Sequence, residues 1–306
     1  MKILLDTSFF GGTGGLEKLV KQIIFQKKQD MEIDIFVSCG FNNEPTFSYD
    51  KVKFIELNEI IFSKYDLYLK IGTNYNYDFF NRVRKDCVKV INPAGYIHNT
   101  EILNFFDYLW EESPNSYDNY QHKNKIVVCS PSSLEYNSPK YNPIIGNVSD
   151  KFFVTAANDY DINIKGIDLI YKFAELSTLD LVWFCSDTKA SQAALYEKSK
   201  KPQKLKIARN MPKNIIYDTI SKSSAYIGFS RRESFGQSLA EAMLLNKPIF
   251  TQNVGVVKYQ PNLFNIYDEN NINTICNTTF ESIQDYSEIT KDFNCFWDNL
   301  LTAIKI

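Results

Sequence analysis

The chain has 306 residues, 44% of them hydrophobic, and a formal net charge of −2. This length fits two domains of ordinary size, and the hydrophobic fraction is sufficient for packed cores. The small negative charge argues against a protein that grips nucleic acid by its phosphates, and two histidines, His98 and His122, are too few for a histidine-rich metal site.

Short apolar runs, typical of buried strands, recur through the first half of the chain. They cover residues 2–6, 31–38, 52–57, 65–72, 87–92 and 125–130. Between the first two runs, Leu16, Leu19, Val20, Ile23 and Ile24 follow the spacing i, i+3, i+4, i+7, i+8, which predicts a helix with one apolar face. Strands that alternate with helices indicate a parallel sheet covered on both faces.

The segment FFGGTGGLEKLV (9–20) connects the first predicted strand to this helix. Its four glycines let the backbone approach a ligand closely, and the N-terminus of a helix favours an anion. The spacing matches neither GxGxxG nor a P-loop. We predict a loop that contacts a ligand; the alternative is a tight turn, for which fewer glycines would suffice.

The same alternation begins again in the second half of the chain. Strands are predicted at 152–156, 181–186, 205–208, 225–230, 247–252 and 264–267, and helices at 166–177, 188–200, 212–222, 236–246 and 291–304. YNSPKYNPIIGN (136–147) has the composition of a linker. We therefore expect two doubly wound, Rossmann-like domains, 1–146 and 147–306, that face each other across a cleft, with the last helix able to pack back on the first domain. Ligands of such sheets bind outside the carboxyl ends of the strands.

The stretch SRRESFGQSLAEAMLLNKP (230–248) places two acids where a predicted strand gives way to a helix. Gly236 permits close approach of a ligand, and the N–H groups of residues 235–238 would form a phosphate cradle. Glu241, one turn into the helix, leans back toward this cradle and can accept two hydrogen bonds from a ribose. Glu233, in the loop, would accept from a sugar. A single acid near a helix N-terminus can simply stabilise the helix dipole. The prediction of a ligand site therefore rests on the presence of both Glu233 and Glu241.

The block E-SFGQSLA-E, followed by AM and KP, resembles the E-x7-E signature of retaining, nucleotide-sugar-dependent glycosyltransferases of family 4, which have the GT-B fold. Four further stretches resemble the family in the same order. They are GGTGGLEKLV (11–20), IIGNVSDKFF (144–153), KGIDLIYKFAEL (165–176) and ISKSSAYIGFSRRE (220–233). The resemblance thus covers both predicted domains.

The resemblance implies a role for each matching residue. Glu241 would bind the donor ribose, Glu233 the donor sugar and Lys165 the diphosphate. His98 would stand near the donor sugar, with a structural or surface histidine as the alternative. The remaining residues that it places at the donor are Gly12, Gly14 and Gly15 across the cleft, and Phe235, Gly236, Gln237 and Ser238 at the sugar and phosphate.

The chain departs from the family pattern before Lys165. The family usually carries an arginine about five residues earlier, where this chain has TAANDYDINIKG, with Tyr160 near that place. Arg209, Arg231 or Arg232 could supply the second positive charge, or be solvated surface residues; we include Arg209 in the donor site. The alternative function is therefore a weak or inactive relative that binds sugar nucleotides or glycans.

We predict a metal-independent, retaining hexosyltransferase that uses no cofactor. It would move a sugar from a nucleotide-diphosphate donor, with UDP-sugar as the expected donor, to a glycan or lipid-linked glycan in polysaccharide biosynthesis. A nicotinamide-dependent oxidoreductase would need GxGxxG and an acid ending the second strand, which here ends in FVSCG.

The expected location is the cytoplasm. The chain has no apolar run long enough to span a membrane, and none of its six cysteines forms a CxxC pair. The helix that carries Lys18, Lys21, Lys27 and Lys28 leaves open a peripheral contact with the inner face of the membrane, with a solvated helix face as the alternative.

Overall fold

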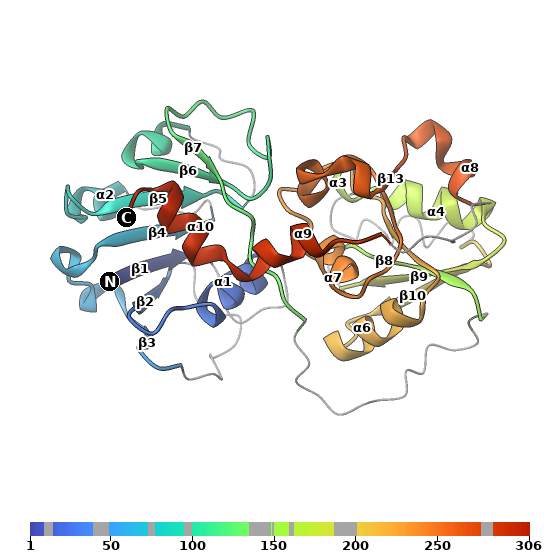
Figure 1. The fold of residues 1–306 in the computed structure, drawn as a ribbon, viewed down its shortest axis with the longest axis horizontal. Coiled ribbons are helices and arrows are strands. Elements are labelled where there is room, and N and C mark those ends of the chain that lie inside the picture. The colour runs from blue at the N-terminus through green and yellow to red at the C-terminus, as the bar shows by residue number, and fades with distance from the viewer. Residues whose placement is uncertain are drawn as a thin grey trace. The chain divides into compact units, whose positions relative to one another are not determined.

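The computed structural model describes residues 1–8, 15–38, 49–72, 77–94, 100–134, 148, 150–158, 162–186, 201–276 and 284–306. The chain forms two compact units, which are described separately (Figure 1). Unit 1 comprises Met1–Ser132 and Asp292–Ile306, and unit 2 comprises Ser133–Lys291. The predicted boundary at 146/147 lies outside the described residues.

Unit 1 is built on a seven-stranded sheet in the order β3-β2-β1-β4-β5-β6-β7, whose neighbouring strands are all parallel. The strands are β1 (Lys2–Thr7), β2 (Glu32–Val37), β3 (Val52–Phe54), β4 (Leu67–Ile71), β5 (Val88–Asn92), β6 (Tyr108–Glu111) and β7 (Lys125–Val127). The helices are α1 (Gly15–Phe25), α2 (Tyr77–Arg82) and α10 (Phe296–Ala303), with 3-10 helices η1 (Leu57–Glu59), η2 (Phe62–Lys64), η3 (Thr100–Phe105) and η7 (Lys291–Asn294).

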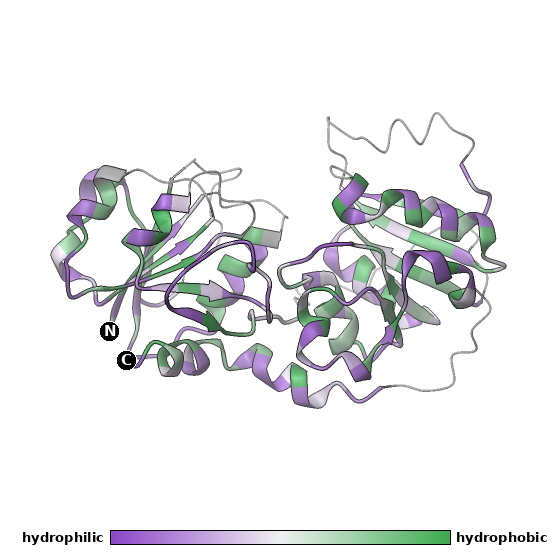
Figure 2. Ribbon diagram, turned by 90° about the horizontal axis from the view of Figure 1, so that it is seen from above, coloured by the Kyte–Doolittle hydropathy of each residue, from purple (hydrophilic) through white to green (hydrophobic). Residues whose placement is uncertain are grey.

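The last helix completes the core of unit 1. Residues on one face of the sheet pack with the apolar face of α1 and with Phe296, Trp297 and Leu300 of α10. The indole of Trp297 donates a hydrogen bond to the carbonyl of Ile23, at 2.9 Å. Hydrophobic residues are concentrated in the strands, and the helices are striped with polar ones (Figure 2).

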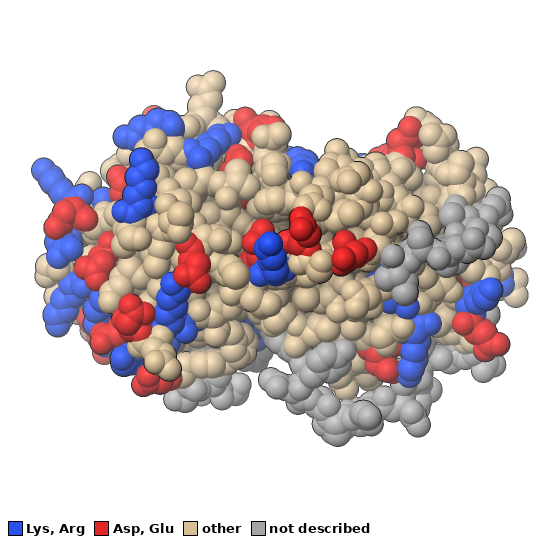
Figure 3. Space-filling model, viewed as in Figure 1, with Lys and Arg blue, Asp and Glu red and all other residues tan. Residues whose placement is uncertain are grey.

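The lysines of α1 and the turn after it are largely engaged within unit 1. Lys18 is 7% exposed. The ammonium of Lys27 donates to the carbonyls of Lys28 and Met31, and Lys28 pairs with Asp298. On the face that Figure 3 shows, basic side chains are interspersed with acidic ones. None of the helices in the described ranges is long and apolar enough to cross a membrane.

Unit 2 is built on a six-stranded sheet in the order β10-β9-β8-β11-β12-β13, again parallel throughout. The strands are β8 (Phe152–Ala156), β9 (Asp180–Cys185), β10 (Leu205–Arg209), β11 (Ala225–Gly228), β12 (Ile249–Thr251) and β13 (Asn265–Ile266). The helices are α3 (Ile162–Lys165), α4 (Ile167–Leu176), α6 (Lys213–Lys222), α7 (Gln237–Leu244), α8 (Ile272–Ile275) and α9 (Ser287–Thr290), with 3-10 helices η4 (Gly255–Tyr259), η5 (Pro261–Leu263) and η6 (Glu269–Asn271).

The two parallel sheets with their covering helices confirm the predicted fold class of both halves. In unit 2 the apolar face of α4 packs with α8 on residues of β8, β9 and β11. The order of strands places β8 and β11 next to each other, so the segments that follow them meet at one edge of the sheet. The predicted helix at 188–200 lies outside the described residues.

Candidate functional site

The loop between β11 and α7 forms the centre of the candidate site. Gly236 is the N-cap of α7 and has φ 88°, a left-handed conformation that glycine adopts without strain. The helix's own hydrogen bonds begin with the N–H groups of Leu239 and Ala240, which both donate to the Gly236 carbonyl. The N–H groups of the first turn point out of a helix end, where they favour an anion.

The structure brings Lys165 and Glu233 into direct contact, although 68 residues separate them. The Lys165 ammonium donates to Glu233 Oε1 at 2.7 Å, and the two side chains are 17% and 18% exposed. Lys165 is the last residue of α3, which follows β8, and Glu233 lies in the loop that follows β11. An ammonium and a carboxylate therefore meet beside the N-terminus of α7, where solvent screens them only in part.

Glu241 is 1% exposed, and its carboxylate is fixed from α6. Oε1 accepts hydrogen bonds from the Tyr217 hydroxyl at 2.9 Å and from the Lys213 ammonium at 3.0 Å. A buried carboxylate needs such partners, because its desolvation is otherwise strongly unfavourable. Glu241 is thus an oriented, charge-compensated acceptor in the middle of α7.

Two further glycines let main-chain segments approach the loop closely. A Cβ on Gly255 (φ 56°) would lie 2.2 Å from the Phe235 carbonyl oxygen and 3.1 Å from Glu233 Cβ. The next residue, Val256, donates its N–H to that same carbonyl at 2.7 Å. A Cβ on Gly166 (φ 63°) would lie 2.2 Å from the Phe229 carbonyl oxygen. Only glycine fits these contacts, which hold the loop against its neighbours.

Phe235, Gln237 and Ser238, the other residues predicted for the donor site in this stretch, lie at the start of α7. The Phe235 side chain is 2% exposed, so it is the main chain of this residue that borders the helix start. Ser238 hydrogen-bonds Tyr226, whose hydroxyl also meets the main chain of Ala156, and burial raises the pKa of this phenol. Gln237 is half-buried at the first position of the helix.

The arginines that could replace the missing cation lie in different surroundings. Arg231 forms ion pairs with Asp168 and Glu269. Arg232 is exposed. Arg209 is the last residue of β10, the edge strand, and β9 and β8 lie between it and β11.

Several predicted residues cannot be placed. Gly12, Gly14 and His98 lie outside the described residues, as does Tyr160. Gly15 is the first residue of α1, at the carboxyl side of β1.

Sequence reasoning did not find Lys213, Tyr217 or Gly255 as members of this group. The first two lie on α6, and Gly255 begins η4. The sequence carries no local signal for their contacts, which depend on how α6 and η4 pack against α7 and its loop.

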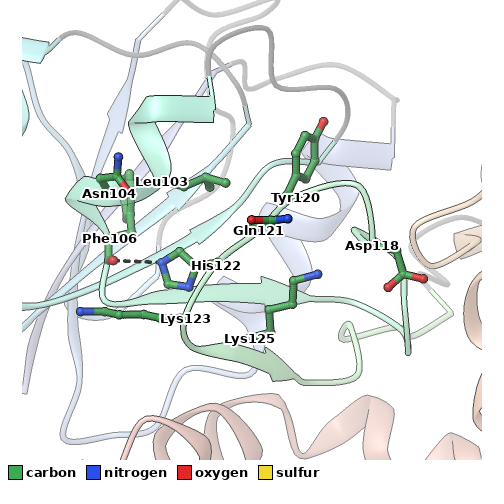
Figure 4. A pocket seen from close by; sticks show the side chains of 9 residues that line it. All are labelled: Leu103, Asn104, Phe106, Asp118, Tyr120, Gln121, His122, Lys123 and Lys125. Atoms are coloured by element: carbon green, nitrogen blue, oxygen red, sulfur yellow. Dashed lines mark hydrogen bonds between the residues drawn. The ribbon is translucent and has the colours of Figure 1, made fainter.

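Unit 1 contains a pocket of about 610 Å³ with a mixed lining (Figure 4). It is lined by Leu103, Asn104, Phe106, Asp118, Tyr120, Gln121, His122, Lys123 and Lys125. His122 Nε2 contacts the Phe106 carbonyl at 3.1 Å, and Nδ1 accepts from the Asn124 N–H at 3.1 Å. Phe106 precedes β6, and Lys125 begins β7. The pocket therefore borders the amino ends of these strands, whereas ligands of parallel sheets bind at the carboxyl ends.

No protein-family model and no curated protein matches the chain. Solved structures, however, match its fold over nearly the whole length. WaaG, a glycosyltransferase involved in lipopolysaccharide biosynthesis, is 10% identical, with a TM-score of 0.64 over 99% of each chain. The trehalose-6-phosphate synthase OtsA is 10% identical, with a TM-score of 0.71 over 100% of this chain and 99% of the other.

A third match is an alpha-glucosyltransferase in complex with UDP and a 13-mer DNA. It is 10% identical, with a TM-score of 0.65 over 100% of this chain and 99% of the other. At such low identity these matches show the fold alone. The chain has the GT-B fold, as the sequence predicted.

Proposed function

We propose that the chain is a glycosyltransferase that moves a sugar from a nucleotide-diphosphate donor, a UDP-sugar, to a glycan or lipid-linked glycan. The observation that carries this proposal is the contact between Lys165 and Glu233 beside the N-terminus of α7, with Glu241 oriented in the same helix. The shared fold with glycosyltransferases, one of them solved with UDP, agrees with it.

In this proposal the ion pair between Lys165 and Glu233 is the form of the site without a donor. A bound diphosphate would take the Lys165 ammonium, and the hydroxyls of the donor sugar would take the Glu233 carboxylate. Until a donor binds, the Lys165 ammonium and the Glu233 carboxylate neutralise each other. Each charge therefore has a partner in a site that solvent reaches only in part.

The chemical step needs stabilisation of the departing nucleoside diphosphate. The Lys165 ammonium and the N-terminus of α7 provide preorganised positive charge where the negative charge develops. Glu241, held by Tyr217 and Lys213, would accept hydrogen bonds from the ribose. We propose a metal-independent reaction that retains the anomeric configuration, because the acceptor would attack on the face from which the diphosphate departs.

The second candidate is a weak or inactive relative that binds sugar nucleotides or glycans. The observation in its favour is that Arg231, one of the arginines that could replace the missing cation, is paired with two carboxylates of unit 2. The positive charge at the diphosphate would then come from Lys165 and the N-terminus of α7, together with any contribution from Arg209, Arg232 or residues outside the described ranges.

A location in the cytoplasm and a role in polysaccharide biosynthesis remain part of the proposal. Peripheral contact with a membrane through the lysines of α1 and the turn after it is not part of the proposal, since Lys18 is buried and Lys27 and Lys28 are engaged within unit 1.

A donor screen tests the proposal. Thermal unfolding is measured with UDP, GDP and their sugars, and nucleotide release is then measured with the donor that binds. We expect stabilisation by UDP and UDP-sugars, and release of UDP with the anomeric configuration of the product retained. Binding without transfer or hydrolysis over a broad acceptor panel would favour the second candidate. Absence of binding by every nucleotide and sugar nucleotide tested would reject the glycosyltransferase and leave only a glycan-binding relative.

A further inference from the structure

Arg231 lies two residues before Glu233, and its guanidinium is fully hydrogen-bonded within unit 2. Nε donates to Glu269 Oε1, and Nη2 donates to Glu269 Oε2 at 3.0 Å and to Asp168 Oδ2 at 2.6 Å. Nη1 donates to Asp168 Oδ1 at 2.8 Å and to the Asn163 carbonyl at 3.1 Å. A guanidinium has five N–H donors. All five are engaged, so Arg231 is not the second cation for a diphosphate.

Two of the acceptors of these hydrogen bonds, Asn163 and Asp168, belong to the segments on either side of Lys165. Asn163 lies in α3, whose last residue is Lys165, and Asp168 lies in the first turn of α4. The main-chain N–H of Arg231 donates to the carbonyl of Ile164, at 2.8 Å. Both the main chain and the side chain of Arg231 therefore connect the Lys165 segment to the Glu233 loop.

A third connection leads from Arg231 to Glu269. Glu269 lies in η6, which follows the edge strand β13, and Lys172 of α4 contacts its carbonyl at 3.5 Å. Bidentate contacts between arginine and carboxylates fix the relative orientation of both groups, and lysine cannot reproduce this planar geometry. Although burial acts in the opposite direction, the hydrogen bonds from Arg231 lower the pKa of Asp168. Both carboxylates thus accept hydrogen bonds from this one guanidinium.

We propose that Arg231 is a positioning residue, which fixes the Lys165 ammonium against the Glu233 carboxylate before a donor binds. The role assigned to this pair rests on the proposed function. When the segments that carry Lys165 and Glu233 are already in place, little of the site has to move as the diphosphate departs, and a misplacement of about 1 Å in such a site can cost about 100-fold in rate. Arg231 contacts neither member of the pair through its side chain; it acts through the segments that carry them.

Arg231→Lys tests the connection without removing the charge. Hydrogen exchange is measured on the unliganded protein. We expect faster exchange in both 162–166 and 229–236, with α6 unchanged, because lysine cannot hold both carboxylates and the Asn163 carbonyl. Asp168→Asn should loosen the same two segments. Glu175→Gln, which removes an exposed carboxylate from the same helix as Asp168, is the matched control and should loosen neither.

Kinetics on the same variants separate positioning from general support of the fold. At a temperature well below unfolding, Arg231→Lys should lower kcat about 10- to 100-fold while UDP affinity stays within about threefold, because the Glu241 contacts lie elsewhere on α7. Equal losses in kcat and UDP affinity would indicate a structural role only. An unchanged kcat, or unchanged exchange in 162–166, would overturn the inference. A wild-type protein without transfer activity would instead reject the proposed function, and hydrogen exchange would still decide the role of Arg231.

Discussion

Removing the Lys165 ammonium should impair the chemical step far more than it impairs folding. Lys165→Met keeps most of the side chain's volume and leaves the Glu233 carboxylate without its 2.7 Å partner. Glu233 is 18% exposed, so water can solvate it in part and the protein should remain folded. The expected defect therefore lies in the stabilisation of the departing diphosphate.

The expected decrease in kcat follows from the loss of one preorganised positive group at the site. Loss of one preorganised donor typically raises the barrier by about 2.7–4 kcal/mol. Each 1.36 kcal/mol corresponds to about tenfold in rate, so kcat should fall about 100- to 1,000-fold. The upper part of this range is expected, because Lys165 is a full charge and Arg231 is engaged with Asp168 and Glu269.

The assay is the release of nucleoside diphosphate at saturating donor, with and without acceptor. Lys201→Met is the control, since Lys201 is an exposed lysine of the same unit. We expect this control to retain wild-type turnover. A loss of less than about threefold in Lys165→Met, with circular dichroism unchanged, would show that Lys165 does not stabilise the leaving group.

Three further predictions concern the support of the site. Lys213→Met removes a donor to the buried Glu241 carboxylate, so urea unfolding should show a loss of about 1–3 kcal/mol in the free energy of unfolding. A second change, Glu241→Gln, should recover part of this loss, and an unchanged midpoint in Lys213→Met would contradict the pairing. Gly255→Ala places a Cβ 2.2 Å from the Phe235 carbonyl oxygen at φ 56°, and we expect a loss of about 1–3 kcal/mol together with lower turnover; a variant with wild-type stability and turnover would show that the loop can shift without consequence. The pKa of Asp168 is lowered in the folded protein, because the opposing effect of burial is outweighed by the hydrogen bonds and the charge of Arg231 together with main-chain hydrogen bonds. Its contribution to stability is therefore present above the unfolded pKa and is lost as the pH falls through the folded pKa. Asp168→Asn should unfold at lower urea than wild type at pH 7, and the difference should shrink toward pH 3; a difference that does not depend on pH would contradict this.

The fold could be predicted because its strands are apolar runs of the kind that buried parallel sheets require. The strand β6 was missed because YLWE (108–111) is short and ends in an acid. Helix α2, YDFFNR, is likewise too short to show a helical period. The assignment of the C-terminal segment to unit 1 depends on contacts such as that of Trp297 with Ile23.

The acids of the candidate site could be predicted from their spacing and Lys165 from the family resemblance, but the contacts that these residues make could not. Glu233 and Glu241 belong to one short stretch, whereas Lys165 reaches Glu233 across 68 residues and Lys213 reaches Glu241 across 28. From the sequence, Arg231 was either a solvated surface residue or a source of the second positive charge at the diphosphate. Its engagement with Asp168 and Glu269 depends on how α4 and η6 are placed beside the loop.

In the proposed function, Glu233 and its neighbours in unit 2 carry out sugar transfer. The most direct test is the rate of transfer by Glu233→Ala beside wild type, with the same donor, acceptor and protein concentration. We expect transfer to be abolished while the fold and the affinity for UDP are retained, since Glu241 and the N-terminus of α7 are intact. Unchanged turnover in Glu233→Ala would contradict it.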